Sequence, residues 1–250
     1  MKQLDQHRFF LKDTLRKSVD FRQTDQRNGI PAPPLEKPFP TDSQRISLPD
    51  PKQWADHVSD KSIVSAISQR RSIRRFKDMD LSVEELSFLL WATQGINDPT
   101  GRNPSLRTVP SAGARHSFES YLFIMGVNDL TPGLYRFLPL ENELLFISTI
   151  SNMKDELSMA CLGQSFAATG AVTFAWTTIP YRMEWRYSLS AHRVILMDVG
   201  HVCQNLYLAC QAINCGTCAL GAYDQEKIDE LLGVDGQEEF TIYLAPVGKI

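Results

Sequence analysis

The run HRVILMDVGHVCQNLYLACQAINCGTCALGAYD, His192–Asp224, decides the fold of this 250-residue chain. Residues 192–215 are apolar on most sides of a helical repeat, which is typical of a helix buried at the centre of a domain. Polar residues interrupt the run and would be costly in a lipid bilayer, so we expect a buried helix and no membrane span. These residues are Asp198, His201, Gln204 and Asn205.

The elements on either side of this helix indicate an α+β fold. Downstream, Asp224 predicts the N-cap of a helix over 225–232. Upstream, Ser82-Val83-Glu84-Glu85 is a capping box that predicts a helix ending near Gly95. Helices and strands intermix without strict alternation, and hairpins occur. We expect further helices over 63–70 and 152–162, strands over 120–127, 171–178, 217–222 and 240–247, and a hairpin of 133–137 with 144–150.

The composition is that of a globular protein with a full core, at 43% hydrophobic and 22% charged residues. A net charge of −3 argues against binding to nucleic acid or to an anionic membrane. The segment Met1–Phe10 has no apolar signal region, so a cytoplasmic protein is expected.

The first 55 residues differ from the rest. Residues 30–40 read IPAPPLEKPFP, which favours extended polyproline conformation. We therefore divide the chain into an extended proline-rich arm, 1–55, and a folded domain, 56–250. The arm is either a flexible leader or a segment that lies across a partner subunit, with Phe9, Phe10 and Phe39 as apolar anchors.

The cysteines favour a structural role. Their odd number does not suggest a disulfide framework. Cys215 and Cys218 form a C-x-x-C, but Cys215 falls at the end of a predicted helix, where the dipole does not favour a thiolate. No second pair of ligands follows, so no metal site is expected.

A basic run, R-R-S-I-R-R-F over Arg70–Phe76, is the first candidate binding site. In an extended chain Arg70, Ser72 and Arg74 would point to one side. Two guanidinium groups and a hydroxyl on one face suit a phosphate monoester. The alternative is a solvated basic strip that pairs with nearby carboxylates.

Two glycine-containing turns are further candidates. P-S-A-G-A-R, Pro110–Arg115, precedes a predicted strand, and its small residues would let the backbone approach a flat ligand. A-L-G-A-Y-D, Ala219–Asp224, joins a strand to a helix, where backbone amides can face a cofactor. Taken singly, each is also explained as an ordinary turn.

Taken together and in this order, these motifs and the P-V-G-K near the C-terminus resemble the nitroreductase superfamily. The G-H-x-x-Q-N-L form within the central helix and the G-L-Y-R-F run at Gly133 are similar to its SagB/ThcOx-type dehydrogenase branch. The resemblance covers about 62–249. It implies an α+β homodimer with an antiparallel-rich sheet around a central helix and two FMN molecules at the dimer interface.

The resemblance also implies roles for individual residues. Arg70, Ser72 and Arg74 would hold the FMN phosphate and ribityl chain, with Arg71 as a helper and Lys249 adding charge near the phosphate. Residues that would line the flavin ring, from the other subunit in one reading, are Pro110, Ser111, Ala112 and Gly113. The backbone of Leu220 and Gly221 would face flavin N5.

The chain departs from the azoline-oxidising members of this family at Arg186. These members carry a Lys-Tyr pair where this chain has Arg186-Tyr187. Lysine can act as a base and arginine cannot, which puts azoline oxidation in doubt. Arg186 and Tyr187 remain candidates for the substrate face. In one interpretation Arg186 would bind an anionic substrate or a nicotinamide phosphate. In the other, both are ordinary surface and core residues.

Other side chains carry weaker signals. Asp198 and His201 are expected to satisfy each other within the central helix, and His116 follows the glycine-containing loop. Trp176, Tyr181 and Trp185 could sandwich a flat substrate, although core packing explains them equally.

The expected function is an FMN-dependent oxidoreductase that transfers two electrons from NAD(P)H to a small flat acceptor by a ping-pong scheme. One alternative is dehydrogenation of an azoline-type heterocycle in natural-product or peptide modification. A second alternative is a flavin-binding module without turnover.

Overall fold

The computed structural model describes residues 3–98, 103 and 105–250, which form a seven-stranded sheet in the order β1-β4-β3-β2-β5-β7-β6. Every neighbouring pair of strands is antiparallel. The stretch from Asn97 to Pro110 is rich in Gly, Pro and Asn, which predicts a loop, and part of it lies outside the described residues. The strands are β1 Arg45–Ser47, β2 Phe118–Ile124, β3 Gly133–Leu138, β4 Glu143–Ser148, β5 Val172–Thr178, β6 Cys215–Thr217 and β7 Phe240–Lys249.

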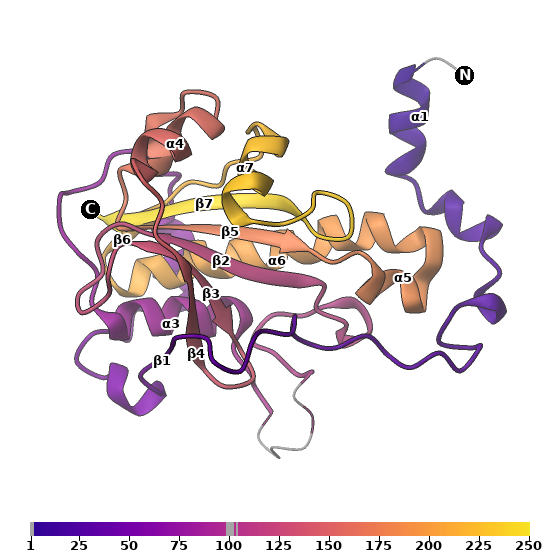
Figure 1. The fold of residues 1–250 in the computed structure, drawn as a ribbon, viewed down its shortest axis with the longest axis horizontal. Helices are drawn as coiled ribbons and strands as arrows, with labels where there is room; N and C mark the ends of the chain where they lie inside the picture. Colours follow the sequence, from indigo (N-terminus) through magenta and orange to yellow (C-terminus); the bar gives the residue numbers. More distant parts are fainter. Residues whose placement is uncertain (1–2, 99–102, 104) are drawn as a thin grey trace.

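Helices cover both faces of the sheet (Figure 1). Helices α3 Val83–Gln94 and α6 Ala191–Ala212 pack on one face, and α4 Met153–Ala160 and α7 Gln225–Leu232 pack on the other. Each face of the sheet carries a hydrophobic core, and strand β2 contributes to both. Leu122 packs in the core on the face covered by α6, and Phe123 in the core on the face covered by α4. The predicted α+β class with an antiparallel sheet is confirmed. The other α-helices are α1 Gln3–Phe10, α2 Ile63–Gln69 and α5 Tyr181–Tyr187.

The long helix α6 is confirmed, with a different end. It stops at Ala212, and Cys215, predicted to be helical, lies in β6 opposite Lys249. The expected strand over 217–222 is correspondingly displaced toward the N-terminus. Within the described residues, no helix combines the length and the apolar character needed to cross a membrane.

Local capping signals predicted several helix ends correctly. Ser82 accepts from the Glu85 amide, and the Glu85 side chain accepts from the Ser82 amide in return. Asp224 caps α7 through the Lys227 amide. Helix α5 and strand β1 were not predicted, since each is short and flanked by irregular segments.

The proline-rich segment 30–40 packs on the body of its own chain. Trp185 donates its indole N–H to the Ile30 carbonyl at 2.9 Å, and Arg136 donates to the Lys37 carbonyl at 2.8 Å. Proline lacks an amide N–H and the extended chain forms no internal hydrogen bonds, so these carbonyls are available to buried donors. The segment is therefore not a free leader, and β1 of the same arm pairs with β4.

A buried carboxylate holds this arrangement together. Glu119 on β2 lies 2.6 Å from the Arg182 guanidinium of α5 and 3.8 Å from that of Arg136 on β3, and it accepts the Lys37 amide at 2.9 Å. The three side chains that form the ion pairs are almost completely buried. Glu119 thus connects the sheet, α5 and the arm.

We expect Glu119→Gln to lower the free energy of unfolding by about 3–5 kcal/mol, because it leaves buried arginine charge without its counterion. Denaturant unfolding followed by circular dichroism measures this change. The control is Glu143→Gln, which removes a partly exposed pair with Arg45 and should cost less than about 1 kcal/mol. Equal effects of the two substitutions would contradict the central role of Glu119.

The arm should also confer a pH dependence on stability. Burial raises the pKa of Glu36 to about 7, opposed by the Leu140 amide and reinforced by the charges of Glu141 and Glu119. A raised carboxyl pKa means that the folded protein binds the proton more tightly than the unfolded chain does. Its stabilising effect is fully present below pH 4.5, the ordinary value, and is lost as the pH rises toward 7.

We therefore expect Glu36→Gln to flatten the fall in Tm of the wild-type protein between about pH 4.5 and 7. The variant should melt at a higher temperature than the wild type at pH 8. Parallel curves for the two proteins over this range would show that Glu36 does not titrate as described. Differential scanning calorimetry at a series of pH values makes the comparison.

Candidate functional site

Two residues of the basic run, Arg70 and Ser72, contact one tyrosine of α6. The Arg70 guanidinium lies 5.2 Å from the centre of the Tyr207 ring, and the Ser72 hydroxyl lies 3.0 Å from the Tyr207 hydroxyl. Arg74 lies over the Phe166 ring at 5.6 Å. We call Arg70, Ser72, Arg74 and Tyr207 the arginine cluster. Tyr207 was not predicted, because only the fold places it beneath the motif.

Arg71 points elsewhere. Its guanidinium donates to the carbonyls of Ser68 and Arg70, 3.0 and 2.8 Å away. The backbone of Ser72 forms a parallel bridge with Thr217 of β6, which holds this part of the run in an extended conformation. The predicted alternation within the motif is thus consistent with the contacts of Arg70, Ser72 and Arg71.

The second glycine-containing turn lies beside the arginine cluster. The Tyr207 hydroxyl accepts the amide of Ala219 at 2.9 Å, so it joins the turn to Ser72. Leu220 is buried, and its amide and carbonyl both bond Leu244. Gly221 is exposed. Of the two residues expected to face a cofactor, only Gly221 presents its backbone at the surface.

Lys249 is not directed to the arginine cluster. Its ammonium group forms an ion pair with Glu85 and donates to the Ile213 carbonyl at 3.1 Å. The charge of Lys249 is therefore balanced within the fold and connects β7 to α3. Sequence could not show this contact, since Glu85 is 164 positions away.

The first glycine-containing turn, Pro110–Gly113, is held by the other part of α6. We call it the glycine loop. Asp198 accepts the Ala112 amide at 3.1 Å, and Ser111 accepts the His116 amide at 3.0 Å. Burial raises the pKa of Asp198, opposed by hydrogen bonds from Ser111 and Ala112. Asp198 was expected to be satisfied by His201, but its carboxylate accepts a hydrogen bond from the glycine loop, and the charge of His201 acts on it in addition.

Strained backbone follows the glycine loop. Gly113 has φ +60°, and the non-glycine residues Ala114 and His116 have φ +52° and +47°. Gly113 is also closely packed: a Cβ there would lie 2.6 Å from the Tyr187 hydroxyl and 2.9 Å from Arg186 Nε. The fold thus brings Arg186 and Tyr187, at the end of α5, directly against the glycine loop.

The arginine cluster and the glycine loop lie on opposite flanks of α6. Their contacts on the helix, Tyr207 and Asp198, are nine residues apart in the sequence. This spacing corresponds to about two and a half turns, or roughly 13 Å along the axis. Between the two flanks α6 exposes Met197, Gly200 and Gln204. One chain therefore does not bring the two predicted groups of residues into a single pocket.

The remaining singled-out residues are mostly structural. His116 is buried, its Nε2 lies 2.8 Å from the Ser105 carbonyl oxygen, and burial lowers its pKa to about 3. Trp176 belongs to the core. Trp185 is buried beneath the Arg115 guanidinium, 4.7 Å from it. His116 is therefore neutral at ordinary pH.

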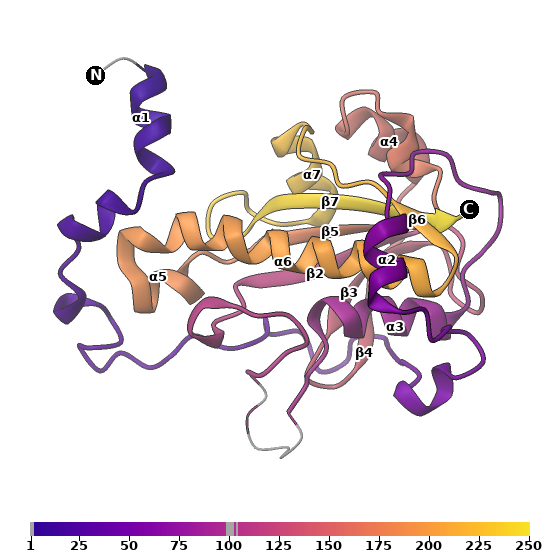
Figure 2. The same ribbon diagram turned by 180° about the vertical axis from the view of Figure 1, so that it is seen from behind.

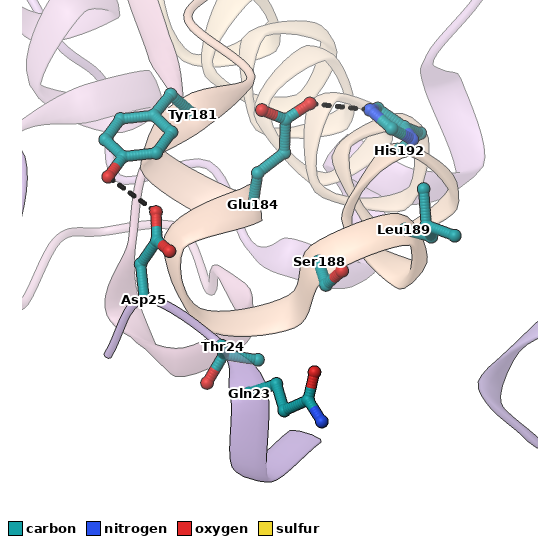
Figure 3. A pocket seen from close by; sticks show the side chains of 8 residues that line it. All are labelled: Gln23, Thr24, Asp25, Tyr181, Glu184, Ser188, Leu189 and His192. Atoms are coloured by element: carbon teal, nitrogen blue, oxygen red, sulfur yellow. Dashed lines mark hydrogen bonds and ion pairs between the residues drawn. The ribbon is translucent and has the colours of Figure 1, made fainter. Parts of the chain in front are cut away.

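A cavity of about 290 Å³ lies between residues 23–25 and the helices α5 and α6. Tyr181, exposed at this site, donates to Asp25 at 2.8 Å, and Glu184 lies 2.7 Å from His192 (Figure 3). No motif in the sequence indicates this cavity. It forms only where the arm packs against α5 and α6, segments that are far apart in the chain. The residues of the arginine cluster and the glycine loop do not line it.

All five cysteines are buried and unpaired. Burial raises the pKa of Cys215 to about 12, so it is not a ready thiolate. The predicted structural role of the C-x-x-C is consistent with this environment. Among the described residues, no group of three or more His, Cys, Asp or Glu side chains could hold a metal ion.

Comparison with known proteins places this chain among flavin oxidoreductases. Residues 67–249 match the Nitroreductase family, and the chain belongs to that family. A candidate nitroreductase of Methanocaldococcus jannaschii, MJ1384, is 30% identical over 208 residues, which cover 83% of this chain and 98% of the relative. The chain is thus an oxidoreductase of a family that generally binds flavin.

Solved structures share the fold. A candidate nitroreductase from Ralstonia eutropha JMP134 superposes with a TM-score of 0.68 at 24% identity, over 88% of this chain and 98% of that one. The NADPH:FMN oxidoreductase of Vibrio harveyi superposes with a TM-score of 0.52 at 16% identity, over 74% and 67% of the two chains.

We expect Gly113→Ala to destabilise the protein by more than the strain of a positive φ alone. That strain is worth about 1–2 kcal/mol, and the new methyl group would also displace Tyr187 and Arg186. The control is Gly163→Ala, at φ +76° with nothing within 4 Å of the added Cβ. Equal losses in unfolding free energy would show that the glycine loop tolerates a side chain.

Proposed function

We propose that this nitroreductase-family chain binds FMN at the interface of a homodimer and passes two electrons from NAD(P)H to a small flat acceptor. The observation that carries the proposal is the unbalanced charge of the arginine cluster. Among the described residues, neither Arg70 nor Arg74 has a carboxylate within ion-pair distance, although both are at least partly exposed. The two guanidinium groups rest on aromatic rings and are available to an anion.

The cluster fits the phosphate of FMN. A phosphate monoester offers acceptor oxygens to two guanidinium forks and to the Ser72 hydroxyl. Gly221, exposed beside the cluster, lets a planar ring approach the backbone. Lys249 has no part in this arrangement, because Glu85 already neutralises it. When bound, the flavin would supply the redox chemistry.

An apolar surface supports the homodimer. On α6, Leu196 and Met197 are 48% and 46% exposed, and on α2, Ile63, Val64 and Ile67 are 59–73% exposed. Figure 2 shows α2 beside the C-terminal part of α6 on the face of the molecule turned away from the sheet. Exposed apolar side chains on two neighbouring helices are typical of a protein interface. A two-fold axis through this face would pair α6 with its copy.

Such a dimer would join the two separated halves of the site. The arginine cluster and the glycine loop occupy opposite flanks of the exposed face of α6. Across a two-fold axis, the cluster of one copy can face the glycine loop of the second. In this arrangement Pro110–Gly113 would border the flavin ring, and Arg186 and Tyr187 would border the substrate.

The alternative of azoline dehydrogenation has less support. It calls for a base near the ring, and Arg186 cannot lose its proton. Tyr187 retains a phenol beside Gly113, but no lysine accompanies it. The second alternative is a flavin carrier without turnover. The visible absorption spectrum distinguishes such a carrier from the proposed enzyme.

The visible absorption spectrum of the purified protein tests the function. We expect flavin bands that bleach on anaerobic addition of NADH or NADPH and return on addition of a nitroaromatic or quinone. Bands that neither nucleotide bleaches would contradict the proposed electron donor and favour the carrier. Absence of flavin bands after incubation with FMN would refute the proposal as a whole.

Arg70→Met and Arg74→Met should each weaken FMN binding by about tenfold or more, since each removes a charge-assisted hydrogen bond. Flavin fluorescence quenching measures the dissociation constant. Riboflavin, which lacks the phosphate, should bind the wild type and both variants with similar affinity. The matched control is Arg75→Met in the same run, which should change FMN affinity less than twofold. Equal losses for FMN and riboflavin would argue against a phosphate site.

A further inference from the structure

Two arginines near the glycine loop lack a counterion. Arg186, in the last turn of α5, lies against Gly113, and Arg115 follows the loop and lies over Trp185. Among the described residues, neither has a carboxylate within ion-pair distance. Burial, and after it the charges of Arg186 and Arg182, lowers the pKa of Arg115. The charge of Arg186 is thus one of the causes that lower the pKa of Arg115.

The neighbouring Arg182, by comparison, has its counterion within the chain. Its guanidinium lies 2.6 Å from Glu119 and also donates to the His116 carbonyl. Arg115, by contrast, donates through Nε to the Arg182 carbonyl, and its buried Nη2 has no partner among the residues that the structure describes. Buried positive charge without compensation is costly, so an anion supplied from outside the chain would relieve it.

The position of Arg186 decides what kind of anion could approach. Its Nε would lie 2.9 Å from a Cβ on Gly113, so it is next to the loop assigned to the flavin ring. The side chain is only half-buried, unlike Arg115 behind it. The 2′-phosphate of NADPH is carried on the adenosine end, far from the nicotinamide. An anion at Arg186 must instead be carried close to the reacting ring, as a carboxylate on a small aromatic is.

We propose that Arg186, backed by the charge of Arg115, binds the carboxylate of a flat aromatic substrate seated beside the glycine loop. Tyr187, whose hydroxyl also abuts Gly113, would contribute a second polar contact. A planar guanidinium fork matches a carboxylate with two parallel hydrogen bonds, which lysine does not reproduce. This inference rests on the proposed function, and it gives Arg186 a role in substrate selection.

The test compares benzoate with benzamide, which have the same shape but differ in charge. Each is titrated into the FMN-loaded protein by calorimetry and by the shift of the flavin spectrum. We expect benzoate to bind the wild type at least tenfold more tightly than benzamide. Arg186→Met should weaken benzoate binding by about tenfold and leave benzamide unchanged. Arg186→Lys should be intermediate, because it keeps the charge and loses the fork.

The control variant is Arg27→Met, an exposed arginine of the arm with no part in the site, and it should keep the wild-type preference. Equal binding of benzoate and benzamide to the wild type, or a preference that survives in Arg186→Met, would overturn the inference. So would a variant that keeps benzoate binding while its KM rises for NADPH and not for NADH, since Arg186 would then read the nicotinamide phosphate. Failure to take up FMN would refute the proposed function and this inference together.

Discussion

Burial of one side of α6 against the sheet is the constraint on which the rest of the structure depends. Ile195, Val202 and Leu206 face the core, whereas Leu196 and Met197 remain exposed. The two flanks between these faces carry the polar contacts, Asp198 to the glycine loop and Tyr207 to the arginine cluster. The rotation of one helix therefore fixes the position of both candidate half-sites.

Buried charges fix the surroundings of these half-sites. Glu119 balances Arg182 and Arg136 and so holds α5 and the proline-rich segment on the sheet. Arg186 and Tyr187 lie at the end of the helix that Arg182 anchors. The ion pairs of Glu119 are thus structural, and the unpaired arginines nearby are the ones available to ligands. Whether an arginine has a carboxylate partner within the fold therefore separates candidate binding residues from structural ones. The residue type alone does not separate them as well.

Local signals predicted much of the fold. The capping box at Ser82, the N-cap at Asp224 and the alternation in the basic run all depend on residues within a few positions of one another. Contacts between distant segments could not be read in this way. Cys215 leaves the helical pattern because it pairs with Lys249 in the sheet.

The candidate site shows the same limit. Motifs identified the arginine run and the glycine loop, but not their common helix or their opposite flanks. The sequence indicated that Lys249 was available to add charge near a phosphate, but in the fold its ammonium group forms an ion pair with Glu85. Tyr207 was not singled out by any motif, and Arg115 was quoted only as the last residue of the P-S-A-G-A-R turn, so the roles of both follow from packing.

The central claim is that each FMN site combines the arginine cluster of one copy with the glycine loop of the other. Mixed dimers test it most directly: a chain with Arg70→Met and Arg74→Met is co-expressed with a chain carrying Gly113→Ala, each with its own affinity tag. Both parent homodimers should bind FMN poorly. The account predicts about one FMN per purified mixed dimer, because one of the two sites regains both intact halves. A mixed dimer that binds no more FMN than its parents would show that each site is built within a single chain.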